Sequence, residues 1–280
     1  MEDIIKKSAY QKVQMARDIN RPKINDYIDM LFEDFIELKG DRLGGDDKAI
    51  LGGIGMFHGK PVTVIGHRKG NSLEENLECN FGMPEPEGYR KAMRLMEQAE
   101  KFNRPVITFV DTPGAYPGIQ AEENGQSVAI ARSIARMTSL RVPIITIITG
   151  EGNSGGALAI AVANTVFMLE NAVYSILSPE GFASILWKDS SKSDKACELM
   201  KITAEDLKKY KIIDEIIPEP EGGIDKKSKK TFRIIEKMLL NELKKYSNMS
   251  GENLSKIRYQ KFRKIDSASG IILKDTVERK

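Results

Sequence analysis

Short apolar runs separated by glycine-bearing turns begin at Ala49, and they predict an α/β core. Apolar residues fill 49–57 and 62–65, and the turn over 58–61 between them predicts a β-hairpin. Further elements alternate along the chain: strands at 106–110, 144–149, 166–169 and 174–177, and helices at 89–102, 122–137 and 155–163. Such strand–loop–helix units indicate parallel pairing, which places ligands at the loops leaving the carboxyl ends of strands.

The N-terminal part has a helical pattern. After Asn25, a candidate N-cap, apolar residues recur at three- and four-residue steps: Ile28, Leu31, Phe32 and Phe35. They predict an amphipathic helix over 26–38, with a second helix before it and a break at Arg21-Pro22. We expect this helical pair, within an N-terminal extension of residues 1–48, to pack outside the main core.

The main core is expected to span residues 49–223. A strand is predicted at 212–217, and the spacing of apolar residues over 232–243 predicts a final amphipathic helix. No strong pattern follows Gly251. We therefore expect residues 224–280 to form a C-terminal helix and a tail.

Composition argues against some classes of function. The chain has 43 basic and 40 acidic residues, and its net charge of +3 does not favour a nucleic-acid partner. Cys79 and Cys197 lack metal-binding spacing, so we expect no metal site and no disulfide framework. Because the chain begins without an apolar leader and has no run of about 18 apolar residues, we expect a soluble cytoplasmic protein and no membrane span.

The segment 146–160, TIITGEGNSGGALAI, is the most informative part of the chain. It reads as a β-branched strand, a glycine loop over Gly150–Gly156 and small residues that can open a helix. Backbone N–H groups at such a junction have no partner within the helix, and glycine lets a ligand oxygen approach them. This loop is therefore predicted to stabilise negative charge with main-chain groups.

The same glycines fit other patterns. Residues 150–155 spell G-x-G-x-x-G, with Glu170 about 20 residues after the first glycine, as in a dinucleotide-binding unit. A nicotinamide-dependent oxidoreductase therefore stays an alternative, and so does a purely structural role for a tightly packed turn.

Residues 152–156 also spell G-x-S-x-G, the turn that presents a nucleophilic serine in hydrolases. That fold needs a histidine after the serine. Both histidines precede it here, which leaves only the unusual order His67, Asp111, Ser154 for a catalytic triad.

A second loop, DTPGAYPG at 111–118, also leaves a buried strand and precedes a helix. Two glycines and two prolines among eight residues make a stiff loop whose amides cannot all pair locally, which suits it to hold a ligand oxygen. Two such loops on neighbouring strands predict one shared site.

The chain resembles the carboxyltransferase α-subunit family of bacterial acetyl-CoA carboxylase. The likeness runs colinearly from about residue 4 to 223, and the segment after Ser228 carries little of it. Six strings carry the resemblance: FIELKGDR (35–42), GHRKG (66–70), NFGMPEPEGYRKA (80–92), DTPGAYPG (111–118), GEGNSGGALAI (150–160) and SPEGFASILWKD (178–189).

The resemblance implies a crotonase-like (ClpP/crotonase) spiral core, flanked by the N-terminal helical pair and C-terminal helices. It implies transfer of a carboxyl group from carboxybiotin, held on a separate biotin carboxyl carrier protein, to acetyl-CoA. The product is malonyl-CoA for fatty acid synthesis, and biotin carboxylase is a further partner. A β subunit would complete an α2β2 assembly and carry zinc and much of the coenzyme A site, so this chain should bind no cofactor directly and act only with β.

The resemblance also implies where the chemistry occurs. The enolates of biotin and of the thioester are both oxyanions, which backbone N–H groups can stabilise without a titratable side chain. We expect the amides of Gly155 and Gly156 to bind the biotin oxygen and those of Gly114 and Ala115 to form the matching or adjoining hole. No side-chain base is assigned. Substrate contacts are expected from loop neighbours: Tyr116, Pro117, Gly118, Gly152 and Ser154.

The β subunit needs a contact surface on this chain. The apolar N-terminal helices are one candidate for it. Packing of those helices on their own core is the equally open alternative.

Overall fold

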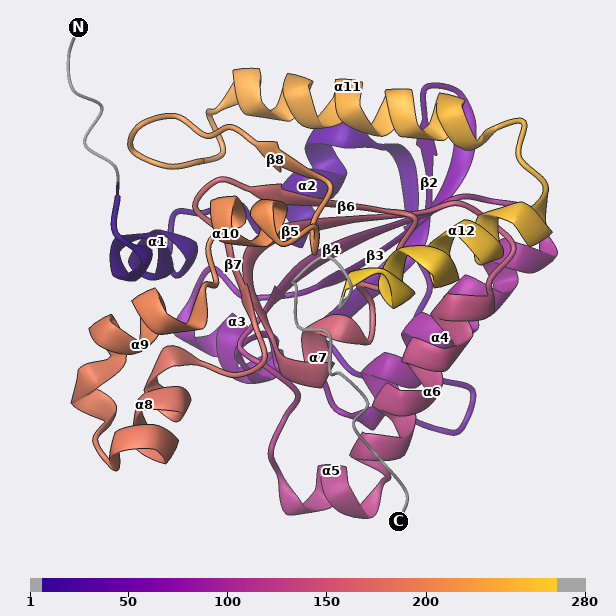
Figure 1. Ribbon diagram of the computed structural model, residues 1–280. Coiled ribbons are helices and arrows are strands. Elements are labelled where there is room, and N and C mark those ends of the chain that lie inside the picture. Colours follow the sequence, from indigo (N-terminus) through magenta and orange to yellow (C-terminus); the bar gives the residue numbers. More distant parts are fainter. Residues whose placement is uncertain (1–6, 266–280) are drawn as a thin grey trace, which may run out of the picture.

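A mixed eight-stranded sheet forms the centre of the structure, a computed structural model that describes residues 7–265 (Figure 1). The strands are β1 Glu33–Glu37, β2 Ile50–Phe57, β3 Lys60–His67, β4 Val106–Thr112, β5 Ile144–Asn153, β6 Thr165–Leu169, β7 Val173–Ser175 and β8 Glu215–Ile217. The longer helices are α1 Ala9–Ala16, α2 Ile24–Leu31, α4 Pro86–Lys101, α6 Gln126–Ser139, α8 Pro179–Trp187, α9 Ser193–Met200, α11 Lys229–Tyr246 and α12 Gly251–Arg263. The shorter ones are α3 Leu73–Glu78, α5 Ile119–Glu123, α7 Ser154–Leu158, α10 Ala204–Lys209 and the 3-10 turns η1 Asn80–Gly82 and η2 Ser190–Lys192.

The strand order confirms the predicted parallel core. The strands follow the order β1-β2-β3-β4-β5-β6-β8, with β7 beside β5. β2 and β3 form the predicted antiparallel hairpin, and all pairs from β3 to β8 are parallel. The carboxyl ends of β3, β4 and β5 therefore meet at one edge of the sheet.

Helices cover both faces of this sheet. Gly52 faces Leu95 of α4, whereas Gly66 on the neighbouring strand faces Ile24 of α2. Figure 1 accordingly shows α2 and α11 on one side of the sheet and α4 and α6 on the other. The missing side chains at the two glycines let both helices pack closely on the hairpin.

The predicted helix over 26–38 is wrong in its second half. α2 ends before Phe32, and residues 33–37 form β1, which pairs antiparallel with β2. Phe32 and Phe35 fit a helix or a strand, but the open edge of β2 supplies backbone partners that an extended chain can use. Asp34, at a φ of 50°, lies within the register shift of this edge strand.

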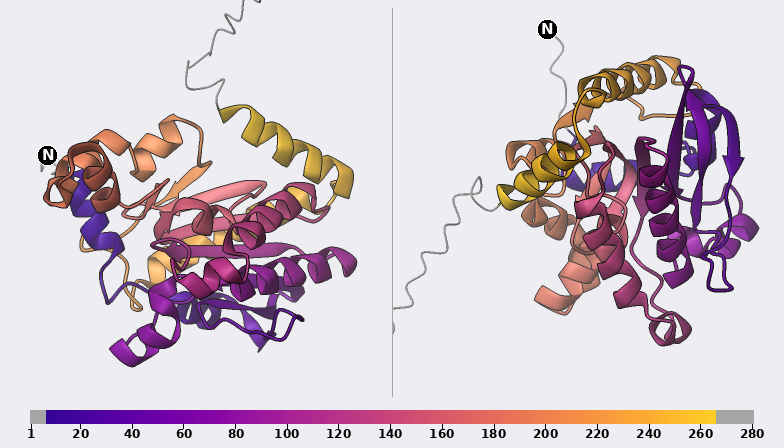
Figure 2. Two further views of the ribbon diagram at one scale, coloured as in Figure 1. Left: turned by 90° about the horizontal axis from the view of Figure 1, so that it is seen from below. Right: turned by 90° about the vertical axis from the view of Figure 1, so that its right-hand side faces the viewer.

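The two N-terminal helices pack differently. α2 belongs to the main core, since Ile24, Tyr27 and Ile28 are buried there and the Tyr27 ring stacks on Phe109 with centroids 5.1 Å apart. The expectation that it packs outside the core is therefore wrong. α1 instead packs on α9 in a separate apolar cluster, at one end of the molecule (Figure 2).

Most of the remaining predicted elements are present. The helix predicted over 89–102 is α4 and the strand over 166–169 is β6, whereas the helix over 122–137 divides at Gly125 into α5 and α6. Gly125 has a φ of 83°, a left-handed conformation that ends one helix and starts the next.

Patterning does not predict α12, because an arginine forms much of its buried face. Arg258 is fully buried, and its guanidinium donates to the carbonyl oxygens of Met137, Leu140 and Val142 at 2.6, 2.8 and 2.8 Å. It also donates to Asn164 Oδ1 at 2.7 Å. Arg258 therefore satisfies the carbonyls that end α6 and fixes α12 against them.

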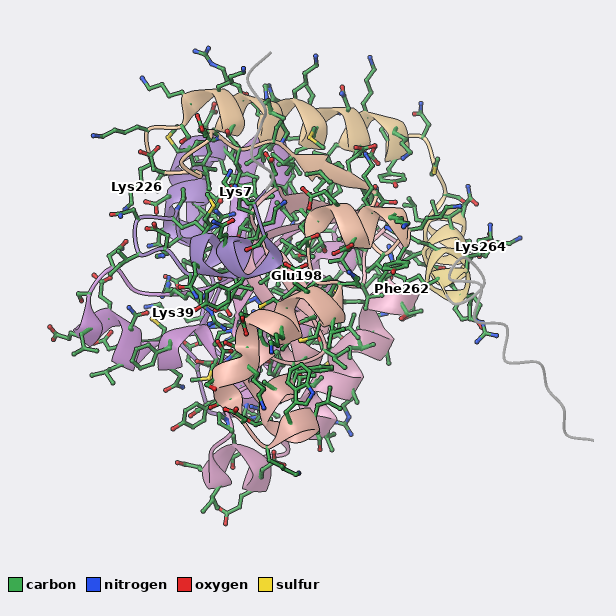
Figure 3. All side chains as sticks on the ribbon, turned by 60° about the vertical axis from the view of Figure 1, so that its left-hand side comes forward. Lys7, Lys39, Glu198, Lys226, Phe262 and Lys264 are labelled. Atoms are coloured by element: carbon green, nitrogen blue, oxygen red, sulfur yellow. The ribbon has the colours of Figure 1, made fainter. Side chains whose placement is uncertain are left out.

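The side chain of Lys226, in the C-terminal part of the chain, points outward in Figure 3. Lys226 pairs with Asp26 at 2.9 Å and is half exposed, which suits a solvated surface. Within residues 7–265, every helix is too short or too polar to cross a bilayer. Two parts of the chain lie outside the described residues. They are residues 1–6, to which the expectation of no apolar leader applies, and residues 266–280, the end of the tail.

We predict that Arg258→Met destabilises the protein by about 3 kcal/mol, because it leaves buried carbonyls without donors. Urea denaturation measures the change in unfolding free energy. Lys256→Met, on the exposed face of the same helix, is the matched control and should change stability by less than about 0.5 kcal/mol. Equal stabilities of the two variants would contradict this account of α12.

Candidate functional site

The two predicted loops meet at one glycine. β4 and β5 are parallel neighbours, and Thr112 pairs with Gly152 near their carboxyl ends. A Cβ placed at Gly156 would lie 2.6 Å from Ala115 N and 2.8 Å from Gly114 C. The backbones that leave the two strands are therefore in direct contact at this point, which we call the Gly156 contact.

The predicted glycine loop is in part a strand. β5 stays extended through Gly150 and Gly152 to Asn153, and the chain turns only at Ser154, at a φ of 63°. A side chain at Gly150 would collide with the carboxylate of Asp111. The first two glycines thus permit close strand packing and make no phosphate-binding turn, which removes the structural basis of the dinucleotide alternative.

Unpaired amides follow this turn. α7 has five residues, shorter than the helix predicted over 155–163, and Asn153 makes no side-chain cap to it. The N–H groups of Gly155 and Gly156 lie in its first turn, where no intrahelical acceptor exists. Gly155 is half-buried and lines the cavity described below, whereas Gly156 is buried directly beneath it in the chain turn.

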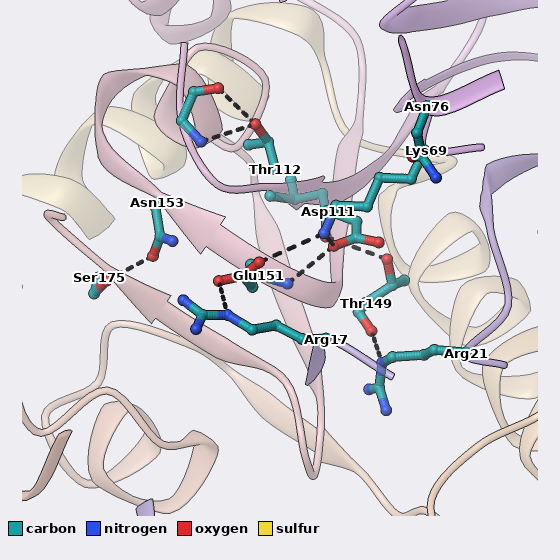
Figure 4. A network of polar contacts seen from close by, with 12 residues as sticks. Arg17, Arg21, Lys69, Asn76, Asp111, Thr112, Thr149, Glu151, Asn153 and Ser175 are labelled. Carbon is teal, nitrogen blue, oxygen red and sulfur yellow. Dashed lines mark hydrogen bonds and ion pairs between the residues drawn. The ribbon is translucent and has the colours of Figure 1, made fainter. Parts of the chain in front are cut away.

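The Gly114 loop is held by a hydroxyl. Thr112 Oγ1 accepts the Gly114 amide at 3.0 Å and donates to the Gly114 carbonyl at 2.7 Å (Figure 4). Gly114 has a φ of 145°, a conformation that favours glycine. The next amide that pairs with the backbone is that of Tyr116, which donates to Pro84 O at 3.0 Å. The Ala115 amide lies between these two paired amides, and it has no acceptor among the described residues.

The predicted substrate-binding residues lie at different depths. Ser154 is exposed beside the Gly156 contact, whereas Gly152 is buried against the ring of Tyr174. Pro117 is exposed, and Gly118 packs under the ring of Tyr116. Ser154 is the member of this set that is open to a ligand next to the free amides.

The structure does not assemble a serine triad. His67 is 2% exposed and lies against the backbones of Gly156 and Phe109. Burial lowers the pKa of His67 to about 3, so its ring is neutral at physiological pH. Within the described part of the chain, no hydrogen bond joins His67 to Ser154.

Tyr89 is a site neighbour that the sequence analysis did not single out. Its ring is fully buried, and its hydroxyl lies 2.8 Å from a Cβ placed at Gly156. This oxygen has no hydrogen-bond partner among residues 7–265. The signal for it in the sequence was its position within the string NFGMPEPEGYRKA, which is one of the strings that carry the resemblance.

An ion-pair network lies beside the two strand exits (Figure 4). Lys69 Nζ contacts Asp111 Oδ1 at 2.6 Å and Glu151 at 3.6 Å, and Arg17 Nε contacts Glu151 at 2.8 Å. Burial would raise the pKa of Asp111, but the Lys69 ammonium overrides this effect and the pKa is lowered. The network therefore ties the ends of β3, β4 and β5 to the end of α1.

A largely apolar cavity of about 480 Å³ adjoins the free amides. Ser154 and Gly155 line its edge. Its apolar walls come from Leu158, Tyr174, Ile176, Phe182, Met200 and Ile212. Within the described residues, no group of three His, Cys, Asp or Glu side chains is arranged to hold a metal ion.

The chain is similar to carboxyl transferase subunits. The family described as acetyl co-enzyme A carboxylase carboxyltransferase-like matches residues 2–266. The acetyl-coenzyme A carboxylase carboxyl transferase subunit alpha of Halalkalibacterium halodurans is 55% identical over 94% of this chain and 81% of its own length. The same subunit of Clostridium botulinum is 56% identical over 95% and 97%. A Clostridium tetani protein named subunits beta/alpha is 55% identical over 93% of this chain and 45% of its own length.

Solved structures share the fold at lower identity. Transcarboxylase 12S with methylmalonyl-coenzyme A bound aligns with a TM-score of 0.65 and 19% identity, over 86% of this chain and 45% of its own. The β subunit of Pseudomonas aeruginosa geranyl-CoA carboxylase aligns with a TM-score of 0.62 and 15% identity, over 83% and 44%. The expected crotonase-like fold is thereby confirmed.

We predict that the His67 ring stays neutral well below its ordinary pKa of 6.5, and that folding stability falls as pH falls. As pH drops from about 6.5 towards 3, the unfolded chain binds a proton that the folded chain excludes. The free energy of unfolding therefore falls by on the order of 1 kcal/mol per pH unit. Proton–carbon NMR of the histidine rings at pH 5 to 8 checks the first point. His58→Gln assigns the signals by removing the other ring, and a His67 midpoint near pH 6.5 would contradict the burial argument.

Proposed function

This chain belongs to the acetyl co-enzyme A carboxylase carboxyltransferase family, and we propose that it transfers a carboxyl group from carboxybiotin to acetyl-CoA as the α subunit of that enzyme. The product is malonyl-CoA, which feeds fatty acid synthesis. Identity of about 55% over nearly the whole chain supports this assignment. The fold shared with other carboxyltransferases agrees with it.

The Gly156 contact is the observation that carries the proposed mechanism. Bound carboxybiotin supplies the carboxyl group, and its ureido oxygen takes up negative charge when that group leaves. The free amides of Gly155 and Gly156 donate hydrogen bonds to this oxygen. Each preorganised donor of this kind lowers a barrier by roughly 3 kcal/mol in other enzymes.

The neighbouring loop contributes in a second way. The Ala115 amide, which touches Gly156, serves the adjoining oxyanion that forms on the acetyl thioester. Gly114 contributes its backbone conformation, since its own amide already donates to Thr112. The two holes lie side by side because β4 and β5 deliver both loops to one edge of the sheet.

The apolar cavity beside Ser154 fits the biotin ring system. Its walls are largely apolar, and Ser154 and Gly155 are part of its lining, so an apolar bicycle whose polar end lies at Gly155 matches the cavity. His67 is neutral and buried away from this opening, and we assign no side-chain base to it.

We propose that the β subunit covers the outer surface of α8 and α9. Figure 1 shows these two helices together at the lower left of the molecule, away from the centre of the sheet. Three large apolar side chains of these helices are exposed: Ile185, Leu186 and Leu199. α1 is a weaker candidate, because its apolar face already packs on α9. The fused beta/alpha relative supports a stable pairing of the two subunits.

Other partners follow from the same reaction. Biotin reaches the site on the biotin carboxyl carrier protein after loading by biotin carboxylase, and zinc belongs to the β subunit. Both cysteines of this chain are free thiols, in keeping with a reducing cytoplasm.

Gly156→Ala should lower kcat of the α–β complex about 100-fold or more, because a Cβ displaces the Ala115 loop and blocks the oxygen site. It should also cost about 1–3 kcal/mol of stability through overpacking. Malonyl-CoA formation is measured at a temperature where urea curves show the variant folded. Gly222→Ala, whose Cβ meets no atom within 4 Å, is the control. Near-normal turnover by folded Gly156→Ala would refute the placement of the site.

The isolated chain should form no malonyl-CoA from acetyl-CoA and carboxylated carrier protein. Addition of the β subunit should restore the reaction, since β completes the acyl-CoA site. Mass spectrometry of the thioester products measures both cases. Turnover by the isolated chain at the rate of the complex would contradict the division of the site between subunits.

A further inference from the structure

A small basic pocket opens at the carboxyl end of β3. Its volume is about 280 Å³, and we call it the Lys23 pocket. Its cationic lining consists of Lys23, Lys48, Arg68 and Lys69. Lys69 also contacts Asp111 at the end of β4, three residues before Gly114, so this pocket lies on the same sheet edge as the Gly156 contact.

Lys23 is a buried cation whose neighbouring carboxylates are occupied. It is only 8% exposed, and no carboxylate in the described residues forms an ion pair with it. The oxygens of Asp26 bind Lys226 and the backbone amide of Lys23, while Asp111 Oδ1 binds Lys69 and the Glu151 amide. Burial accordingly lowers the pKa of Lys23. An ammonium buried in this way is costly unless an anion joins it.

Arg68 adds a second unused donor. Its Nε is buried without a hydrogen-bond partner among residues 7–265, although its terminal nitrogen contacts Glu37 at 3.2 Å. Lys48 pairs with Glu78 at the exposed rim and contributes little to the interior. The interior therefore holds the charges of Lys23, Arg68 and Lys69. Carboxylates pair with the last two of these, and Glu75 also lines the pocket, so Lys23 is the cation there without an ion pair among the described residues.

The wall of the Lys23 pocket is preformed. The Gly70 amide donates to Asn76 Oδ1 at 2.9 Å, and Asn76 Nδ2 donates to the Gly70 and Ser72 carbonyls at 3.2 and 2.9 Å. A side chain at Gly70 would collide with Glu75, so α3 is packed directly onto the strand exit. An anion would thus enter a pocket that needs little reorganisation.

We propose that the Lys23 pocket binds a phosphoryl group. Such a group presents three strong acceptor oxygens and up to two negative charges, which match the three cationic side chains better than a carboxylate does. The inference rests on the proposed function for its source, because an acyl-CoA thioester carries phosphoryl groups. Free phosphate or pyrophosphate carries the same chemistry.

Inorganic pyrophosphate is the probe for the pocket itself. Isothermal titration of the chain should give saturable binding that Lys23→Met weakens about tenfold and Lys23→Arg largely keeps. Lys39→Met removes an exposed lysine of the same charge and should bind as the wild type does. Lys23→Met should unfold at an equal or higher urea concentration, because it removes an unpaired buried charge. Equal pyrophosphate affinity of Lys23→Met and Lys39→Met would overturn the proposal.

A second arm identifies the source of the phosphoryl group. In the α–β complex, the preference for acetyl-CoA over acetylpantetheine is measured as the ratio of their kcat/KM values. This ratio should fall about tenfold in Lys23→Met and keep its wild-type value in Lys39→Met. A ratio that stays constant while pyrophosphate binding is lost would assign the pocket to free phosphate and reject coenzyme A. If no complex forms malonyl product, the proposed function fails, yet the titration still decides whether the pocket binds phosphoryl groups.

Discussion

Direct backbone contact between the exits of two parallel strands is the constraint on which the site depends. Gly156 touches Gly114 and Ala115, and any side chain at that position would separate them. The contact places free amides from both loops together without a charged side chain. Backbone dipoles suit this task because they cannot lose a proton and cost no reorganisation during the reaction. A carboxyltransferase built in this way needs no histidine at its centre, and the neutral, buried His67 agrees with that.

The surrounding structure holds the contact in place. Parallel pairing of β3, β4 and β5 brings their carboxyl ends to one edge, and the ion pairs of Lys69 with Asp111 and Glu151 tie the three ends together. Thr112 fixes the Gly114 peptide at both its N–H and C=O groups. A cationic pocket beside the same edge gives these charges a second use, since phosphoryl groups can be bound at a distance from the reacting atoms.

The sequence predicts the core well because its signals are local. Apolar runs, glycine turns and helical spacing give the hairpin, the parallel strands and α4, and the strings around Gly114 and Gly156 identify both loops. Other features depend on tertiary contacts. β1 forms because β2 offers an open edge, α12 is anchored by the buried Arg258, and the Gly114 amide is occupied by Thr112. None of these pairings leaves a periodic pattern in the chain. That Lys23 has no ion-pair partner among the described residues can be seen only once its neighbours are placed.

A crystal structure of the α–β complex with biotin in the site tests the account most directly. The distance from the ureido oxygen of biotin to the amide nitrogens of Gly155 and Gly156 is the deciding quantity. We expect about 2.7–3.1 Å, the range of oxyanion-hole donors, with the ring in the cavity beside Ser154. A ureido oxygen that binds side chains instead, or lies out of hydrogen-bond reach of both amides, would contradict the claim that bare peptide groups stabilise the charge.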